Sequence, residues 1–402
     1  MDQALSDVKV LDLTHYITGP YCTKLLADYG ADVTKIEKPG EGDGARRLGP
    51  FYQDKPHPER SGLFLHLNTN KKSITLNLKS DTGKNIFKEL VKGVDILVEN
   101  FSPHVMPELG LSYEALEEIN PRLVMTSISN FGQTGPYRDF EASDIILFGM
   151  GGDMHGSGLP DREPVKYAIN VVLYQAGAIA APATIGGFFA AKYKDIGQHI
   201  DISVMEELAH GIDLRSTHLV AYAYTGEVNP RLPENWMASP SGTFPCKDGY
   251  FRITGGWQYW DKLTNMLGSP EFITDPKWKT PAAQSDPALR QEFEAFFIGW
   301  LMQYTKKELW EIAQSAGLPS SPLYTVEDLL NDRHFNDRGA FEEIHHPVVG
   351  KIKYPGRPFI MSETPWKAKI PAPLLGQHNE EIYGQLGYSK EDLIRLKETG
   401  VI

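Results

Sequence analysis

The feature that most constrains this fold is an alternation of short apolar segments and helix-like segments over the first 130 residues. The apolar, β-branched segments are VKVLDL, DVTKIEK, residues 73–78, VDILVEN and LVMTSIS. Between them lie helix-like segments such as YCTKLLADYG, which ends at Gly30, and the polar stretch 81–92. This rhythm predicts an α/β fold with a parallel, doubly wound sheet and helices on both faces.

The rest of the chain predicts an inserted domain. A helix rich in Ala and Gly over residues 173–192 is followed by the strand-like HIDISV. From about residue 229 the sequence becomes rich in Pro, Trp and Gly, with short strands in GTFPCKDGYFRIT and then helices. A Pro-rich return leads to YPGRPFIM and a last helix, EDLIRLKE. We therefore expect a large domain from residues 1–225, completed by a return segment, 326–402, and a smaller α+β domain over 226–325.

Composition excludes several classes of function. A net charge of -12 and a pI near 5.5 disfavour binding to nucleic acid or to a membrane surface. The longest apolar stretch, 176–191, is short for a bilayer span, and the N-terminal residues lack a signal-peptide pattern, which favours a cytoplasmic location. Cys22 and Cys246 are far apart and suit neither a disulfide framework nor a metal site, so we expect two buried thiols.

Short motifs for nicotinamide, nucleoside triphosphate, zinc-protease or serine-hydrolase chemistry are missing from the positions where those motifs function. Longer segments are informative. They are VLDLTHYITGPYCTKLLADYGADVTKIEKPGEGD, NKKSITLNLKSDTGK, VENFSP, SNFGQTGPYRD, GQHIDISVMEE and PAPLLGQHNEEIYGQLG. Together, and in this order, they resemble the class III (CaiB/BaiF) CoA-transferases, to which formyl-CoA transferase belongs.

The resemblance covers essentially the whole chain and implies a fold and a chemistry. The fold is a Rossmann-like large domain built from both chain ends, a smaller inserted domain, and two subunits interlocked like links. The substrates are coenzyme A thioesters and carboxylic acids, with no permanently bound cofactor or metal. Both active sites of such an assembly lie at subunit interfaces, so each chain can contribute loops to its partner's site.

The resemblance also indicates that the catalytic nucleophile is missing. Members of the family use an aspartate carboxylate to attack the acyl-CoA carbonyl, which is covalent catalysis by an oxygen nucleophile. The corresponding segment here is PVKYAINVVLYQAG, with Pro164, Val165 and Gly177 in register, and Leu173 occupies the aspartate position. No acidic residue occurs between Glu163 and Asp195, so a small shift of the alignment restores no carboxylate.

Three other positions differ from the family pattern in ways that affect the CoA site. Ile17 replaces a glutamine that lines the site, and Glu108 and Glu141 replace basic residues that bind CoA phosphates. Carboxylates at these places would repel phosphate oxygens. The chain's own CoA site is therefore altered as well as lacking a nucleophile.

Five positions match the family's CoA-binding residues: Lys38, Leu76, Lys79, Asn100 and Phe101. Lys38 matches an adenine-contacting basic residue, Leu76 and Lys79 match positions beside the nucleotide, and Asn100 with Phe101 forms the family's ENF turn, so the resemblance implies that they contact CoA. The alternative is that these residues only close the Rossmann-like sheet, and the sequence leaves both interpretations open.

Other acidic and basic residues are candidate catalytic groups. Asp12 and His15 could form an acid/base pair, although their spacing is more typical of a strand end. Asp144 and Asp153 are possible substitute nucleophiles. The related α-methylacyl-CoA racemases pair the aspartate with a histidine whose place is taken by Ser143, which disfavours racemisation.

The sequence favours a non-catalytic subunit of a heteromeric CoA-transferase, paired with an aspartate-bearing homologue. Succinyl-CoA is a candidate acyl donor, since succinyl-CoA:benzylsuccinate CoA-transferase is a heteromeric member. Within the loop 236–245, Ser239, Ser241 and Gly242 are candidates to line the partner's site, and a plain turn between domains is the alternative. Two further hypotheses remain, a homodimeric enzyme with altered chemistry and an acyl-CoA binding protein without catalysis.

Overall fold

The chain forms two compact units in the computed structural model, which describes residues 3–210, 214–232, 239–280, 283, 286–366 and 370–402. The first unit contains residues 1–157, 165–229 and 337–402, and the second contains residues 158–164 and 230–336. The domain boundaries expected from the sequence are at residues 225/226 and 325/326. The second unit therefore extends 11 residues further toward the C-terminus than we expected, and it also takes up residues 158–164.

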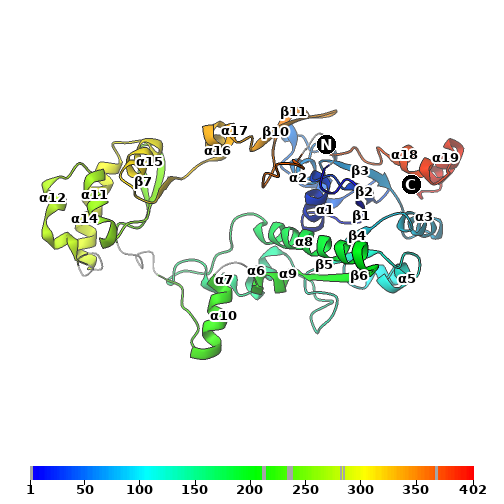
Figure 1. Cartoon of the computed structure of the whole chain (residues 1–402), viewed down its shortest axis with the longest axis horizontal. Helices are drawn as coiled ribbons and strands as arrows, with labels where there is room; N and C mark the ends of the chain where they lie inside the picture. Colours follow the sequence, from blue (N-terminus) through cyan, green and yellow to red (C-terminus); the bar gives the residue numbers. More distant parts are fainter. Residues whose placement is uncertain (1–2, 211–213, 233–238, 281–282, 284–285, 367–369) are drawn as a thin grey trace. The chain divides into compact units, whose positions relative to one another are not determined.

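The first unit is built on a six-stranded, fully parallel sheet with the order β3-β2-β1-β4-β5-β6 (Figure 1). The strands are β1 (Lys9–Asp12), β2 (Asp32–Glu37), β3 (Lys71–Thr75), β4 (Ile96–Glu99), β5 (Val124–Ser129) and β6 (Gln198–Ser203). The predicted parallel sheet is thereby confirmed. One strand differs from the expectation of 73–78, because β3 begins at Lys71 and ends at Thr75.

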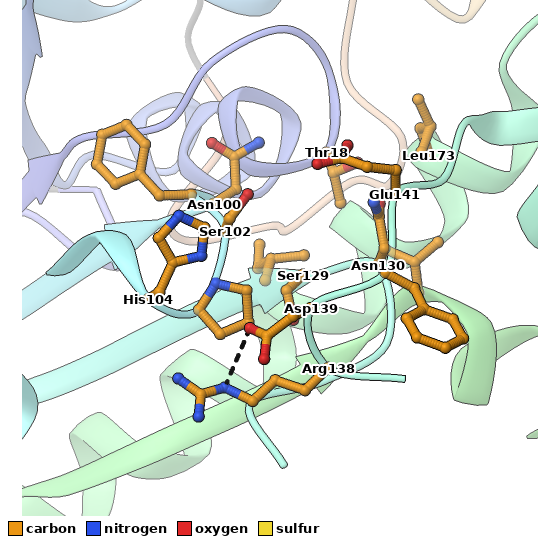
Figure 2. A pocket seen from close by; sticks show the side chains of 15 residues that line it. Thr18, Asn100, Ser102, His104, Ser129, Asn130, Arg138, Asp139, Glu141 and Leu173 are labelled. Carbon is orange, nitrogen blue, oxygen red and sulfur yellow. Dashed lines mark ion pairs between the residues drawn. The ribbon is translucent and has the colours of Figure 1, made fainter. Parts of the chain in front are cut away.

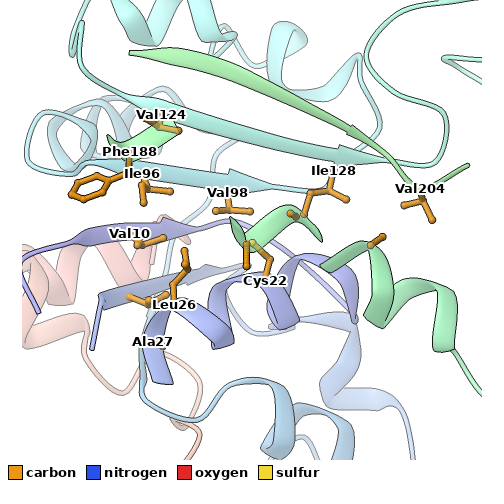
Figure 3. Packing of buried hydrophobic residues seen from close by; sticks show 14 of the residues in the cluster. Val10, Cys22, Leu26, Ala27, Ile96, Val98, Val124, Ile128, Phe188 and Val204 are labelled. Atoms are coloured by element: carbon orange, nitrogen blue, oxygen red, sulfur yellow. The ribbon is translucent and has the colours of Figure 1, made fainter. Parts of the chain in front are cut away.

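Both faces of this sheet carry a buried apolar cluster, and the strands β1, β4 and β5 are buried at nearly every position. Successive side chains go to opposite faces: Val10 belongs to one core cluster and Leu11 to the other. Figure 3 shows the first cluster, in which strand residues such as Ile96 and Val98 lie against helix residues such as Cys22 and Leu26. Cys22 and Cys246 are both free and buried, as predicted.

Helices of the first unit supply the two layers over the sheet. Its α-helices before the return segment are α1 (Thr18–Asp28), α2 (Gly62–Leu67), α3 (Asp81–Val91), α4 (Val105–Glu108), α5 (Tyr113–Glu117), α6 (Asp144–Met150), α7 (Asp153–Gly156), α8 (Val171–Lys194), α9 (Val204–His210) and α10 (Leu214–Thr225), with short 3-10 turns η1 (Gly44–Arg47) and η2 (Tyr52–Asp54). Residues of α1, α6, α8 and α9 contribute to one cluster, and residues of α3, α4 and α5 contribute to the other.

Helix α8 is the longest described helix and packs on α1, β5 and β6. It approaches them closely because it is rich in Gly and Ala. A Cβ atom at Gly177 would lie 2.5 Å from the carbonyl oxygen of Thr18, and one at Gly187 would lie 2.8 Å from side-chain atoms of Ile200 and Val124. By length and composition alone α8 could cross a membrane, with 44% of its most apolar stretch buried. Its packing on the sheet gives the apolar composition a structural reason.

The C-terminal segment completes the first unit. It contains the antiparallel hairpin β10 (Phe341–His346) and β11 (Gly350–Pro355), then α18 (Asn379–Gln385) and α19 (Lys390–Glu398). The hydroxyl of Tyr383 donates to the carbonyl oxygen of Thr75 at 2.6 Å, and Val401 and Ile402 are buried in the second cluster. In Figure 1 the red C-terminal helices lie near the blue strand β3. The edge strand is thereby covered by the far end of the chain.

The second unit is an α+β arrangement around an aromatic core. Its antiparallel sheet has the order β7-β8-β9. The elements are β7 (Gly242–Cys246), β8 (Gly249–Ile253), β9 (Ser320–Pro322), α11 (Trp260–Met266), α12 (Glu271–Thr274), α14 (Pro287–Leu301), α15 (Lys306–Ser315), α16 (Val326–Asn331), and the 3-10 turns η3 (Trp257–Tyr259) and η4 (Pro276–Lys279), with α17 (Arg333–Asp337) at its end. Trp260, Trp278, Phe293 and Phe297 form its centre.

Candidate functional site

A polar cavity of about 120 Å³ lies at the carboxyl ends of β4 and β5 in the first unit. The strand order reverses between β1 and β4, and ligands of open parallel sheets bind in the crevice at such a point. Figure 2 shows the side chains around the cavity. The lining residues are Thr18, Asn100, Phe101, Ser102, Pro103, His104, Ile128, Ser129, Asn130, Arg138, Asp139, Phe140, Glu141, Leu173 and Val204.

Leu173 lines this cavity from the first turn of α8. The close contact of Gly177 with Thr18 holds the start of α8 against α1, one helical turn after Leu173. The leucine side chain is half-buried and packs against the core cluster beneath it. The register predicted from the sequence therefore brings position 173 to the cavity wall, where a leucine can supply neither a nucleophile nor a proton.

Two carboxylates line the same cavity. Asp139 lies 3.8 Å from the Arg138 guanidinium, measured between Oδ1 and Nε, and this ion pair is drawn in Figure 2. Glu141 is the second carboxylate of the cavity wall. In the sequence comparison with the family it takes the place of a basic residue that binds a CoA phosphate. Arg138 is the one Lys or Arg side chain among the 15 described lining residues, so the cavity has no excess of positive charge to attract phosphate.

Other sequence candidates lie outside the cavity lining. Ile17 is 4% exposed and precedes α1, and Glu108 is exposed on α4. Asp144 forms an ion pair with Lys166, and Asp153 is buried on α7. None of the four belongs to the lining residues of the described cavity, so neither Asp144 nor Asp153 has the position that a substitute nucleophile at this cavity requires.

Asn100 holds two loops of the sheet edge together. Its Oδ1 accepts from the backbone N–H of His15 at 2.8 Å, and its Nδ2 donates to the carbonyl oxygen of His15 at 2.9 Å. The Phe101 ring lies 5.7 Å from the His15 imidazole, centroid to centroid. These contacts connect the loop after β1 to the loop after β4, which gives Asn100 a structural task besides any contact with a ligand.

The buried acid Glu99 supports the turn that contains Asn100 and Phe101. The Oε2 atom of Glu99 accepts from the backbone N–H of Phe101 at 2.8 Å, and Glu99 is 3% exposed. Burial raises the pKa of Glu99 to about 7, although the hydrogen bonds from Ser127 and Phe101 oppose the shift. Ser127 also shares a hydrogen bond of 2.8 Å with His199 on the neighbouring strand β6. Glu99, Ser127 and His199 thus form a chain of titratable and hydroxyl groups on β4, β5 and β6, and none of the three belongs to the lining residues of the described cavity.

A buried ionic network lies under the loop after β1. Asp12 Oδ2 is 3.0 Å from Lys71 Nζ, and Asp43 Oδ2 is 2.9 Å from Lys35 Nζ. All four side chains are fully buried. Burial opposes ionisation of Asp12, but Lys35 and Lys71 outweigh it and hold the pKa of Asp12 below its ordinary value. His15 lies 3.7 Å from Asp43 rather than in a pair with Asp12, so the Asp12 carboxylate has a structural environment.

The residues proposed to bind the nucleotide of CoA have different surroundings. The exposed Lys38 forms an ion pair of 2.6 Å with Glu41, and Lys79 is exposed just after β3. Leu76 is 3% exposed and packs in the second core cluster. Lys79 and Lys38 are thus both exposed to solvent, with Lys38 already paired to Glu41, and Leu76 contributes to the fold whether or not it also contacts a ligand.

The candidate partner-site loop belongs to the second unit. Ser241 Oγ accepts from the backbone N–H of Gly255 at 2.9 Å, and Ser239 is 3% exposed. Gly242 has a φ of 153°, a backbone conformation that other residues rarely adopt. Residues 236–238 of the proposed loop lie outside the described residues. The placement of this loop at a partner's site stays a prediction.

The sequence did not identify several side chains of the cavity wall. They are Ser102, His104, Ser129, Asn130, Arg138 and Asp139. For Ser102, His104, Ser129 and Asn130 the available signal was their position at or just after the ends of VDILVEN and LVMTSIS, because loops at the carboxyl ends of parallel strands carry the ligand-binding groups. Within the described part of the chain no three His, Cys, Asp or Glu side chains come together as a possible metal site.

Comparison with known proteins adds independent findings. The model of the family described as CoA-transferase family III matches residues 5–379. The chain is 34% identical to succinyl-CoA–D-citramalate CoA-transferase of Chloroflexus aurantiacus, over 99% of this chain and 98% of that protein. It is 32% identical to formyl-CoA:oxalate CoA-transferase of Streptomyces coelicolor, over 100% of this chain and 99% of that protein.

Solved structures agree with this picture. A CaiB/BaiF family protein from Brucella suis superposes with a TM-score of 0.85 at 29% identity, with 96% of this chain and 100% of that chain covered. The Rv3272 protein from Mycobacterium tuberculosis has the same fold, with a TM-score of 0.77 at 23% identity over 94% of this chain and 98% of that chain.

Proposed function

This chain belongs to CoA-transferase family III, whose members use CoA thioesters as substrates, and on that premise we propose that it is the non-catalytic subunit of a heteromeric CoA-transferase. Its partner is a homologous chain that carries the catalytic aspartate. The complex moves CoA between an acyl-CoA and a carboxylic acid in the cytoplasm. The interlocked arrangement implied by the family would place loops of this chain, including Ser239, Ser241 and Gly242, at the partner's site.

One observation carries the proposal, namely that Leu173 lines the cavity at the carboxyl ends of β4 and β5. Covalent catalysis by a carboxylate requires an oxygen nucleophile within contact distance of the thioester carbonyl. At position 173 the side chain is a hydrocarbon that packs into the core. The scaffold around it is intact, since Gly177 still allows α8 to approach Thr18. A retained scaffold without a nucleophile suits a subunit that stabilises an active partner.

The charges around the cavity support the same proposal. Glu141 and Asp139 line the wall, and Arg138 already has Asp139 as an ion-pair partner. An acyl-CoA that brings phosphates or a second carboxylate toward this wall would meet unfavourable Coulomb interactions. The productive site of the heteromer is therefore expected on the partner.

Succinyl-CoA is our candidate acyl donor. The similarity to succinyl-CoA–D-citramalate CoA-transferase extends over nearly the entire length of both chains and supports this choice. The acceptor would be a carboxylic acid that the partner's site selects.

The test is co-expression of this chain with an aspartate-bearing homologue. We expect CoA transfer from succinyl-CoA by the complex and none by this chain alone. Replacement of the partner's aspartate by Ala should abolish transfer, and Leu173→Ala in this chain should leave it within about twofold of the unmodified complex, because a change confined to a hydrocarbon removes no reacting group. A purified chain that is homodimeric and active without a partner would contradict the proposal.

Glu141 supports a second candidate function, a homodimeric enzyme with altered chemistry. Its carboxylate oxygen would bond to the thioester carbonyl carbon as the C–S bond breaks, giving a mixed anhydride and CoA thiolate. The thiolate would then attack the glutamyl carbonyl, release the acyl group as a carboxylate and leave a glutamyl-CoA thioester. Intact-mass analysis with succinyl-CoA separates the candidates: an adduct on the wild type that Glu141→Gln abolishes favours this enzyme, and its absence favours the non-catalytic subunit.

A further inference from the structure

A row of polar side chains crosses three strands on one face of the parallel sheet. The strand register pairs Glu99 of β4 with Ser127 of β5, and Ser127 with Asp201 of β6. His199 lies two residues before Asp201, so its side chain leaves the same face. Glu99 and Ser127 are buried, whereas His199 and Asp201 are exposed on β6, the edge strand of the sheet. The row therefore leads from a buried acid to the surface.

Ser127 connects the buried end of this row to the exposed end. Its Oγ atom lies 2.8 Å from Nε2 of His199, and the same side chain hydrogen-bonds the carboxyl of Glu99. A hydroxyl has one hydrogen to donate and two positions at which it can accept. Ser127 therefore donates either to Glu99 or to His199, and the other neighbour must donate to it. The directions of the two hydrogen bonds are decided together.

The proton on Glu99 selects between two arrangements. A protonated Glu99 donates to Ser127, and Ser127 donates to Nε2 of His199, which leaves the imidazole neutral with its hydrogen on Nδ1. An ionised Glu99 accepts from Ser127, so Nε2 of His199 must carry a hydrogen and donate it to Ser127. The change conserves protons: Glu99 passes one to Ser127, Ser127 passes one to Nε2, and Nδ1 releases one to solvent. Two groups that share a bond in this way titrate as a coupled pair.

The surroundings place this change near neutral pH. Burial raises the pKa of Glu99 to about 7, and the Asp201 carboxylate adds to the rise. Burial lowers the pKa of His199, while Asp201 and Glu114 of α5 act in the opposite direction. The Tyr113 ring stacks on the imidazole, with centroids 5.4 Å apart and planes 15° apart, which holds the orientation of the ring. A change of tautomer therefore needs no movement of the imidazole.

Two further titratable groups stand near the row. Glu117 accepts a hydrogen bond of 3.4 Å from the Tyr113 hydroxyl, and the His15 ring lies 5.7 Å from the Phe101 ring. Glu117 is exposed on α5, and His15 contacts the turn after β4 rather than Glu99 itself. The direct hydrogen-bond partners of Glu99 are Ser127 and the backbone of Phe101.

The row is also attached to the wall of the polar cavity. Oε2 of Glu99 accepts from the backbone N–H of Phe101 at 2.8 Å, and Asn100 and Phe101 line the cavity. Oδ2 of Asp201 accepts from the backbone N–H of Gln133 at 2.9 Å, in the loop after β5 that lines the same cavity. An ionised acceptor forms the stronger hydrogen bond, so loss of the Glu99 proton tightens the turn at Phe101.

We propose that Glu99, Ser127 and His199 form a proton-linked switch between the cavity wall and the edge strand β6. Loss of the Glu99 proton reverses the Ser127 hydroxyl, moves the hydrogen of His199 from Nδ1 to Nε2 and tightens the turn at Phe101. Because such coupling is reciprocal, a ligand that moves this turn, or a partner that contacts His199, changes the proton affinity of Glu99. The switch is a property of this chain whether or not a partner carries the nucleophile.

The test follows the tautomer of His199 by nitrogen NMR of the full chain with labelled histidine, from about pH 6 to about pH 8. The chain has 12 histidines, and loss of one signal in His199→Gln assigns it. In the wild type Nε2 should change from a bare acceptor to an N–H as the pH passes about 7. Glu99→Gln should keep Nε2 a bare acceptor throughout, because the glutamine amide donates to Ser127 and cannot titrate.

Ser127→Ala removes the connecting hydroxyl and should abolish the change at His199, since Glu99 then titrates without a bonded route to the imidazole. Thr126→Val is the matched control: Thr126 is a buried hydroxyl on the same strand that bonds Thr184 on the opposite face, and this variant should titrate as the wild type does. Circular dichroism would establish that each variant is folded. A tautomer that stays constant in the wild type, or a change that persists in Glu99→Gln or Ser127→Ala, would overturn the switch.

Hydrogen exchange at the Phe101 amide measures the effect on the cavity wall. After correction for the intrinsic pH dependence of exchange, protection in the wild type should rise by about fivefold above pH 7, because the acceptor becomes charged. Protection in Glu99→Gln should not depend on pH. Equal protection of the wild-type amide on both sides of pH 7 would show that the proton does not act on the turn, and the proposed switch would be wrong.

Discussion

The buried carboxyl of Glu99 makes the stability of the first unit depend on pH in a direction opposite to that of most acids. Its ordinary pKa of 4.5 is raised to about 7, chiefly by burial. A raised pKa in the folded state means that the folded protein binds the proton more tightly than the unfolded chain does. The contribution of Glu99 to stability is fully present below pH 4.5 and is lost as the pH rises toward 7.

The magnitude follows from the size of the displacement. A tenfold change in proton affinity corresponds to about 1.4 kcal/mol, so a rise from 4.5 to about 7 corresponds to about 3 kcal/mol of unfolding free energy. The substitution Glu99→Gln removes the titration and keeps an oxygen that can accept from the Phe101 N–H. The glutamine variant should therefore gain about 3 kcal/mol relative to the wild type between pH 4.5 and pH 7.

Urea unfolding of both proteins at half-unit steps from pH 4.5 to pH 8 measures this difference. Other groups titrate in the same range, including His199, whose pKa is lowered by burial, but their contributions cancel in the difference between wild type and variant where Gln does not alter them. Glu118→Gln, at an exposed position, is the control and should give no slope. A difference that stays constant with pH would refute the assignment of a buried, protonated Glu99.

Further substitutions examine other parts of the site. Leu173→Asp should restore no transfer and form no CoA adduct on intact-mass analysis, because Glu141 lines the same cavity; it should also lower the unfolding free energy by a few kcal/mol, since a carboxylate replaces a half-buried leucine. Gly177→Val should destabilise the first unit by about 1–3 kcal/mol in urea, as the new side chain meets the Thr18 carbonyl oxygen. Asp12→Asn should cost about 3–5 kcal/mol in the same assay, because Lys71 loses its buried counter-charge. Gly242→Leu should lower the kcat of the heteromer while the complex still assembles on gel filtration; unchanged kinetics would reject Gly242 as part of the partner's site.

The sequence predicted the parallel sheet because short segments with an apolar centre, such as VDILVEN and LVMTSIS, alternate with helix-like segments. It misplaced β3 for an identifiable reason. Lys71 and Lys72 resemble a polar loop, yet Lys71 is a strand residue whose ammonium group is fully buried beside Asp12. A partner 59 residues away in sequence overrides the local preference there.

The position of Leu173 was predictable because register with Gly177 is a property of one helix. The cavity wall was not, because Arg138, Asp139 and Ser129 meet Leu173 only through the packing of loops on separate elements.

The contacts of a residue that matches a CoA-binding position of the family decide how much that match reveals about ligand binding. Both polar atoms of the Asn100 amide are occupied by the backbone of His15, and Leu76 is packed in the core. These residues would be required for the fold even in a chain that never meets CoA. Exposed groups with fewer such tasks are the discriminating ones, and in this chain they include Lys79 and Lys38, of which Lys38 is paired with the exposed Glu41. A chain that has lost its nucleophile can therefore keep most of a family's site residues for structural reasons, and only substitutions at its exposed groups separate retained binding from retained folding.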